Sequence, residues 1–162
     1  MKFLIISDIH DNLVNLEKCL NWGRGQAIDN AICPGDVVNS QTLAYLAKNF
    51  KTIYLVRGNL EIYEANEVKR YNNIKYLGRF GVTEIDGKSV GLCHEPWYIK
   101  NVLAIKPCQI VFYGHTHDPW IEEKDGLITA NPGTLGGVFT KASFAVWDSA
   151  SGELELKILE LI

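Results

Sequence analysis

The first 60 residues alternate short apolar runs with segments of helical periodicity. Residues 2–7, 31–33 and 52–56 are short, continuous apolar runs, which predict strands that are buried on both faces. Between these runs, apolar residues recur every three or four positions over residues 13–22 and 43–47, which predicts two helices. This β-α-β-α-β order is typical of a parallel sheet with right-handed crossovers. In such sheets, ligands bind beyond the carboxyl ends of the strands.

The second half of the chain has the pattern of paired strands. Asp-Gly at 86–87, Asp-Gly at 125–126 and the polar segment 149–152 each separate two runs with strand-like composition, as hairpin turns do. We expect a further buried strand at 109–113 and a short helix at 98–105. The pattern as a whole predicts an α/β fold in which two sheets pack together with helices outside.

Length, composition and charge limit the number of domains, the partners and the location that we expect. The chain has 162 residues and 47% hydrophobic residues, and no linker-like stretch divides it, so we expect a single domain over residues 1–162. A net charge of −3 argues against a nucleic-acid partner, which would require a strong basic excess. No apolar run is long enough for a signal peptide core or a membrane span, so we expect a cytoplasmic protein without membrane contact.

Polar side chains follow five of the predicted strands, at the point where each strand ends. The motifs are Asp-x-His, Gly-Asp, Gly-Asn, a lone histidine and Gly-His-Thr-His. Alone, the first four motifs are weak evidence, because a turn, a strand cap or a packed histidine explains them more readily, whereas two imidazoles flanking one residue are a moderately specific metal signal. The set is stronger, because the carboxyl ends of parallel strands converge. The candidate metal ligands are Asp8, His10, Asp36, Asn59, His94, His115 and His117.

Seven oxygen and nitrogen ligands are more than one tetrahedral ion takes, so they suit two ions that share a carboxylate. Asp36 is the natural bridge, because it follows a central strand. Mixed imidazole and carboxylate ligation suits two divalent ions, with manganese expected first and nickel, iron, zinc or cobalt as alternatives. Two ions about 3.5–4 Å apart recur in enzymes that hydrolyse phosphate esters.

This ordered series of motifs resembles that of the calcineurin-like metallophosphoesterase superfamily. The resemblance spans residues 8–117, and Asn-Pro-Gly-Thr at 131–134 resembles a further loop of the small prokaryotic phosphodiesterase branch. It implies a four-layer α/β/β/α sandwich of two mixed sheets flanked by helices. It also implies two ligand sets: Asp8, His10, Asp36 and His117 for one ion, and Asp36, Asn59, His94 and His115 for the other.

The resemblance further implies a hydrolase for small phosphate diesters. A hydroxide that bridges the two ions would attack phosphorus, with Asp36, Asn59 and His94 as the catalytic residues. A homodimer is compatible with the family. Three more side chains are candidate contacts of the substrate phosphate: Arg57, Asn12 and Thr134.

Two positions depart from the family pattern. Many members carry a histidine directly after the asparagine, as a general acid, whereas this chain has Leu60, which cannot donate a proton. Glu95 follows His94 where the family usually has glycine, and it either crowds the phosphate or points to solvent. Trp97 and Trp120 either pack within similar loops or border the cleft and stack on a base.

Two hypotheses compete with the enzyme. The retromer complex contains a small subunit that resembles this fold and serves mainly as an interaction module, and its metal set is degraded. Here all seven positions carry competent ligands, which favours an enzyme over such a scaffold. A metal-dependent binding protein, in which Leu60 marks lost chemistry, is the third hypothesis.

Overall fold

The computed structural model describes residues 1–162 and contains eleven strands and six helical segments. The strands are β1 (Lys2–Ile5), β2 (Asn30–Cys33), β3 (Thr52–Leu55), β4 (Ile74–Tyr76), β5 (Phe80–Ile85), β6 (Lys88–Cys93), β7 (Ile110–Phe112), β8 (Trp120–Lys124), β9 (Leu127–Asn131), β10 (Ser143–Asp148) and β11 (Leu154–Ile158). The helices are α1 (Leu13–Gly25), α2 (Ser40–Asn49), α3 (Ala65–Val68) and α4 (Ile99–Ile105), with two 3₁₀ turns, η1 (Pro96–Tyr98) and η2 (Leu159–Leu161).

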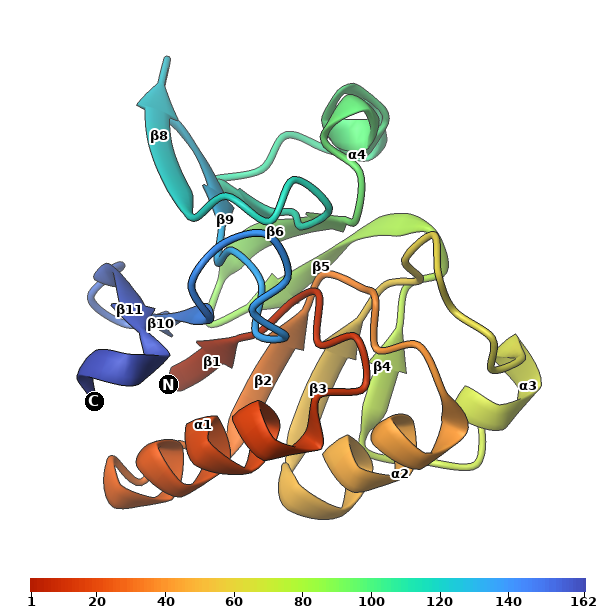
Figure 1. Ribbon diagram of the computed structural model, residues 1–162. Helices are drawn as coiled ribbons and strands as arrows, with labels where there is room; N and C mark the ends of the chain where they lie inside the picture. The colour runs from red at the N-terminus through yellow and green to blue at the C-terminus, as the bar shows by residue number, and fades with distance from the viewer.

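The strands form two mixed sheets (Figure 1). The six-stranded sheet has the order β11-β10-β1-β2-β3-β4, with β1 to β4 parallel and β10 antiparallel to β1. The five-stranded sheet has the order β5-β6-β7-β9-β8, with a parallel centre and antiparallel edge strands. The parallel strands of each sheet end at a common edge, and the predicted motifs follow β1, β2, β3, β6 and β7.

Three clusters of buried apolar residues separate four layers. The first cluster joins α1 and α2 to the six-stranded sheet and includes Leu16 and Leu4. The second lies between the sheets, where Phe3 and Phe112 contact the Trp147 indole at ring-centroid distances of 5.6 and 5.5 Å. The third, smaller cluster lies where α4 covers the five-stranded sheet (Figure 1). This arrangement confirms the predicted α/β/β/α sandwich of two mixed sheets flanked by helices.

The predicted strands and helices are all present, but α3 and β4 were not predicted. Strand β4 has three residues, all partly or fully exposed, so its sequence is too short to show a strand period. Helix α3 has a single turn and begins with a capping box between Glu64 and Glu67, which is a weak signal before so short an apolar run.

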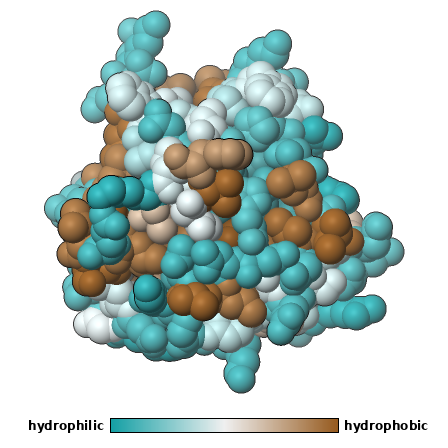
Figure 2. All heavy atoms as spheres, in the orientation of Figure 1, coloured by the Kyte–Doolittle hydropathy of each residue, from teal (hydrophilic) through white to brown (hydrophobic).

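The surface mixes polar regions with small apolar patches (Figure 2). Among the exposed large apolar side chains are Leu60, Ile62, Trp97 and Phe139, and the Phe139 side chain is 94% exposed. None of the helices combines the length and the apolar character that crossing a membrane requires.

Candidate metal centre

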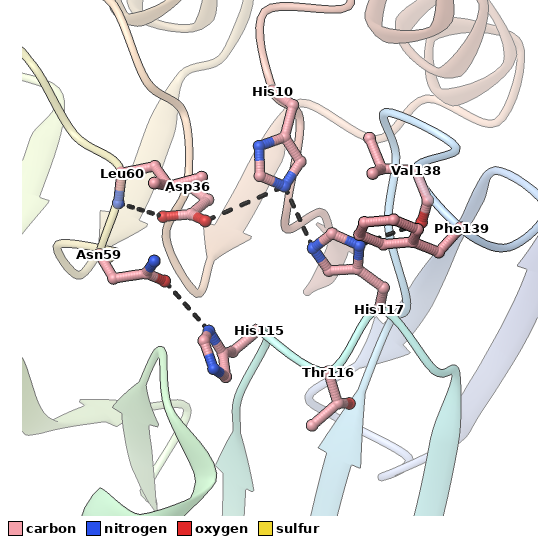
Figure 3. Close-up of a pocket in the computed structure, with 9 residues that line it drawn as sticks. All are labelled: His10, Asp36, Asn59, Leu60, His115, Thr116, His117, Val138 and Phe139. Atoms are coloured by element: carbon pink, nitrogen blue, oxygen red, sulfur yellow. Dashed lines mark hydrogen bonds and ion pairs between the residues drawn. The ribbon is translucent and has the colours of Figure 1, made fainter.

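The seven predicted ligands come together where the two sheets meet. Five of them line one pocket of about 550 Å³ (Figure 3), together with Leu60, Thr116, Val138 and Phe139. The other two, Asp8 and His94, have no exposed surface and lie against the first five. The motifs that appear weak one by one in the sequence therefore form a single constellation.

Two carboxylates lie among the imidazoles. Asp8 Oδ1 is 3.1 Å from His117 Nε2, 3.7 Å from His10 Nε2 and 4.0 Å from His94 Nε2. Asp36 Oδ2 is 3.4 Å from His94 Nε2 and 3.9 Å from His10 Nε2. Ligand atoms of Asp8, His10 and His117 lie within 4.8 Å of one another, and so do those of Asp8, Asp36 and His94. Asp8 thus belongs to both groups, a shared position that the sequence predicted for Asp36 alone.

Asn59 joins the remaining histidines. Its Oδ1 lies 2.9 Å from His94 Nε2 and 3.0 Å from His115 Nδ1. His94 Nδ1 donates to the Pro34 carbonyl at 2.8 Å, which fixes the proton of the neutral ring on that nitrogen. In this tautomer the lone pair of His94 Nε2 faces the carbonyl oxygen of Asn59, which is also an acceptor.

A backbone carbonyl also orients a histidine ring on the other side of the pocket. His117 Nδ1 donates to the Val138 carbonyl at 3.0 Å, so its Nε2 lone pair faces His10 Nε2 at 3.1 Å (Figure 3). Asp8 Oδ1 is fully buried and has no hydrogen-bond partner. Two carboxylates, the Asn59 oxygen and ring nitrogens with lone pairs are gathered in this small space, which favours positive charge among them. A donor set of carboxylates, imidazoles and an amide fits a divalent metal ion.

The backbone that carries these side chains is strained. Five of the seven predicted ligands have a left-handed backbone: Asp8 (φ 51°), His10 (φ 47°), Asp36 (φ 54°), His115 (φ 71°) and His117 (φ 60°). Such a conformation costs a non-glycine residue on the order of 1–3 kcal/mol, and strain of this kind concentrates at functional sites. The surrounding structure therefore holds the ligands in positions that their own backbone disfavours.

Two motif glycines allow the ligand loops to approach closely. A Cβ on Gly58 would lie 2.0 Å from Asp36 Oδ1 and 2.3 Å from the Asp36 amide nitrogen. A Cβ on Gly114 would lie 2.1 Å from Ser7 Oγ and 2.7 Å from Asp8 Oδ2. The Gly-Asn and Gly-His pairs, which look like turns in the sequence, are required by this packing.

Comparison with known protein families gives a match over most of the chain. A family model described as the calcineurin-like phosphoesterase superfamily domain matches residues 1–152. The chain belongs to the calcineurin-like phosphoesterase superfamily.

Three relatives show how far the likeness to this superfamily extends. Phosphodiesterase MJ0936 of Methanocaldococcus jannaschii is 28% identical over 166 residues, which cover 99% of this chain and 100% of that protein. The solved structure of an archaeal phosphodiesterase matches with a TM-score of 0.86 and 24% identity, over 98% of this chain and 99% of that chain. Vps29 of Entamoeba histolytica, solved with Zn²⁺, matches with a TM-score of 0.69 and 23% identity, over 97% of both chains. The two structures show that the fold is shared.

The phosphoesterase domain contains a positioning residue that its sequence does not reveal. Glu61 is 8% exposed, and its carboxylate accepts the backbone N–H groups of Val37 at 3.2 Å, Val38 at 2.6 Å and Gly58 at 3.1 Å. These amides belong to the loops after β2 and β3, which carry the second and third motifs. Glu61 therefore fixes one ligand loop relative to the other. An acidic residue after Gly-Asn gives no sign of this in the sequence, because an exposed turn has the same composition.

Two of the predicted substrate contacts have structural partners. Asn12 caps α1 by accepting the Asn15 amide at 3.1 Å, and it donates to the Gly136 carbonyl at 3.0 Å. Thr134 is buried, and its hydroxyl donates to the Asp8 carbonyl at 2.9 Å. Their phosphate contacts stay predictions, since neither residue lines the pocket and both hold neighbouring loops in place. Arg57 lines a second hollow beside the pocket.

The two departures from the superfamily pattern have different surroundings. Leu60 lines the pocket and its amide donates to Asp36 Oδ1 at 3.0 Å, so an aliphatic side chain occupies the place after Asn59 (Figure 3). Glu95 is 2% exposed and pairs with Arg79 at 3.0 Å. Its carboxylate therefore neither points to solvent nor lines the pocket.

The two tryptophans of the repeated loops also differ. The Trp97 ring lies 5.1 Å from the His115 ring at an interplanar angle of 83°, and the side chain is 56% exposed. Trp97 therefore borders the centre with part of its indole free. Trp120 lies at the start of β8 and is 55% exposed, and neither indole belongs to the pocket wall.

The ionisation of the site follows from its geometry. Burial opposes ionisation of Asp8, but the imidazoles of His10 and His117 beside it more than offset this effect, and the pKa of Asp8 is lowered. Burial opposes ionisation of Asp36 as well, but the contact with His94 outweighs it, and the pKa is lowered. Burial lowers the pKa of His94, but its contacts with both carboxylates outweigh this effect and raise it. Asp8 raises the pKa of His117.

We expect the metal-free protein to be less stable at about pH 8 than at about pH 6. His94 and His117, whose pKa is raised, contribute stability below the unfolded value of 6.5 and lose it as the pH rises through their folded pKa. Asp8 and Asp36, whose pKa is lowered, contribute above 3.8 and lose stability as the pH falls through their folded pKa. Both contributions are therefore present between these two values.

Thermal unfolding of the EDTA-treated protein across this range tests the expectation. Added Mn²⁺ should reverse the trend above neutral pH, because metal ligation requires deprotonated imidazoles. A metal-free protein whose unfolding midpoint stays constant or rises from about pH 6 to about pH 8 would contradict the prediction.

Proposed function

We propose that this chain is a divalent-metal-dependent phosphodiesterase with a two-ion centre. The observation that carries the proposal is the convergence of two carboxylates, four imidazoles and one amide around the buried Asp8 carboxylate. The likeness to phosphodiesterase MJ0936 over the full length of both chains supports the choice of a diester.

The residues would divide between two ions as the superfamily resemblance implies. The ligands of one would be Asp8, His10, Asp36 and His117, and those of the other Asp36, Asn59, His94 and His115. When bound, the ions would lower the pKa of a water between them and neutralise charge on the phosphoryl oxygens. Manganese is our first candidate, with nickel, iron, zinc and cobalt as alternatives for the same donor set.

The chain's own contribution is to place these groups before substrate arrives. The Pro34 and Val138 carbonyls orient the rings of His94 and His117, and Glu61 holds the loops that carry Asp36 and Asn59. In the reaction, the oxygen of water bonds to phosphorus and the bond from phosphorus to the leaving oxygen breaks. One proton of the water ends on the leaving oxygen, and the products are an alcohol and a phosphate monoester.

Hydrolysis should slow steeply as the leaving group becomes more basic. Leu60 lines the pocket where a general acid would protonate the leaving oxygen, and leucine has no proton to give. The measurement is kcat/KM for aryl phosphodiesters of graded phenol pKa with saturating Mn²⁺. Leu60→His should flatten the dependence, and Leu60→Met, which keeps an apolar side chain of similar size, should not. A flat dependence in the wild type, with chemistry rate-limiting, would contradict the prediction.

The proposed function itself is tested by loading the protein with metals one at a time. EDTA-treated protein is reloaded with Mn²⁺, Ni²⁺, Zn²⁺, Fe²⁺ or Mg²⁺, its metal content is measured, and bis(p-nitrophenyl) phosphate and p-nitrophenyl phosphate are assayed. We expect two ions per chain and metal-dependent hydrolysis of the diester. Bound metal without hydrolysis of any ester would instead favour a metal-binding interaction module, a second candidate for which the Vps29 structure with Zn²⁺ provides a precedent of the same fold.

The proposal extends to the substrate and the setting of the enzyme. We propose a small diester rather than nucleic acid, because the chain carries a net charge of −3. A homodimer and a cytoplasmic location belong to the same proposal. Sedimentation velocity at several concentrations tests the dimer.

A further inference from the structure

A second hollow beside the metal centre carries two arginines. It has a volume of about 400 Å³, and its wall consists of Arg57, Gly58, Asn59 and Arg79, with no apolar residue. Asn59 also lines the metal pocket, so the hollow opens directly beside the candidate metal centre. A group attached to a phosphate in the metal pocket could extend into this hollow.

Arg79 is held in place on one side and free on the other. Its Nη2 donates to Glu95 Oε1 at 3.0 Å, and its guanidinium carbon lies 5.0 Å from the centroid of the Tyr98 ring. The Tyr98 ring is stacked in turn on Phe80, with ring centroids 5.2 Å apart. The Arg79 side chain nevertheless stays 60% exposed. Its remaining N–H donors are therefore oriented in advance for a ligand in the hollow.

Arg57 carries a charge that the protein does not neutralise. The backbone amide of Arg57 donates to the carbonyl of Gly78 at 2.7 Å. Since Gly78 precedes Arg79, this bond holds the backbones of the two arginines close together. Arg57 Nη2 contacts the Glu61 carbonyl at 3.4 Å, and no carboxylate lies within 4.0 Å of its guanidinium. With Glu95 offsetting the charge of Arg79, the hollow retains the positive charge of Arg57.

We propose that this hollow binds a second phosphate group of the substrate. The inference rests on the proposed function, because the second phosphate would be attached to one of the two substituents of the diester that is hydrolysed. Guanidinium groups match the oxygens of phosphate with paired N–H donors, and two of them on one wall suit a terminal phosphate monoester. The substrate class is therefore a phosphodiester with a second phosphate on one substituent, such as a nucleoside 5′-diester that bears a 3′-phosphate.

Two substrates that differ only in this phosphate provide the test. Thymidine 5′-(p-nitrophenyl phosphate) is compared with its 3′-phosphorylated form on the Mn²⁺-loaded enzyme. We expect the added phosphate to lower KM by about tenfold with little change in kcat, because it strengthens ground-state and transition-state binding alike. Arg57→Gln and Arg79→Gln should each reduce this preference. Arg70→Gln, which removes one positive charge from an exposed position after α3, should keep it.

A binding measurement separates failure of the hollow from failure of the proposed function. Calorimetry on EDTA-treated protein compares thymidine 3′,5′-bisphosphate with thymidine 5′-monophosphate and needs no catalysis. If neither ester is hydrolysed but the bisphosphate binds more tightly in an Arg57-dependent way, the hollow stands and the proposed function fails. If the diester is hydrolysed but the second phosphate changes neither KM nor binding, the hollow is overturned. Arg79→Gln leaves Glu95 buried without its partner, so the unfolding midpoint of each variant is measured. Arg57→Gln breaks no ion pair, and the test relies on this variant alone should Arg79→Gln fail to fold.

Discussion

Replacing Asp36 with asparagine should abolish phosphodiester hydrolysis and remove metal from the protein. Asp36 Oδ2 lies 3.4 Å from His94 Nε2 and 3.9 Å from His10 Nε2, so its charge serves histidines of both ligand groups. Loss of an outer-shell partner of a metal ligand lowers metal affinity or activity about 10–100-fold. Loss of a ligand itself should lower kcat by more than that. Asparagine keeps an oxygen that accepts the Leu60 amide, so the loop should stay in place.

Metal content and kcat for bis(p-nitrophenyl) phosphate are measured on the same preparation of the variant. Asp118→Asn is the matched control, because it removes the same charge from an exposed side chain directly after His117. The control should retain metal and activity. An Asp36→Asn protein with wild-type metal content and rate would show that the centre does not work as proposed.

Adding one methyl group at Gly58 should damage the site almost as severely. The new Cβ would lie 2.0 Å from Asp36 Oδ1 and 2.3 Å from the Asp36 amide nitrogen, distances that force the ligand loop to move. Overpacking of this kind costs about 1–3 kcal/mol of stability, and a displaced Asp36 can no longer serve both ligand groups. We expect a lower free energy of unfolding in urea and loss of metal and diesterase activity.

Gly25→Ala is the matched control for this substitution. Gly25 ends α1, and a Cβ there would meet no atom within 4 Å. The change should be neutral or stabilising by about 0.4–1 kcal/mol, through the unfolded state. Wild-type activity in Gly58→Ala would mean that the two loops can separate without loss of function.

The sequence predicts the layers and the convergence of the candidate ligand side chains because both depend on local pattern. Asp8 and His10 come soon after a buried strand, and parallel strands place the residues beyond their carboxyl ends at one edge of the sheet. Strand β4 was not predicted because three residues are too few to establish a strand period. The shared position of Asp8 was not foreseen, because it depends on loop conformations that bring three imidazoles to one oxygen.

Residues that act through tertiary contacts were harder to find. In the sequence, Glu61 looks like an ordinary turn residue. In the structure, three backbone amides from two loops donate to its carboxylate. The sequence gives no sign that Arg79 could contact a ligand. The orientation of its side chain depends on Glu95 and Tyr98, which lie in the connection after β6. For Glu95 the sequence left two alternatives, crowding of the phosphate or exposure to solvent, and in the structure the buried carboxylate instead holds an arginine beside the centre.

The left-handed backbone of the ligand loops sets fold stability and function against each other. Glycine would relieve strain at His10 or His117, so a search for more stable variants of the metal-free chain would favour replacing the very side chains that we propose as metal ligands. Selection for thermostability without metal should therefore drift toward a well-folded but inactive protein. The same selection with metal present would preserve these side chains, because metal binding would then stabilise the folded state that contains the strained conformation.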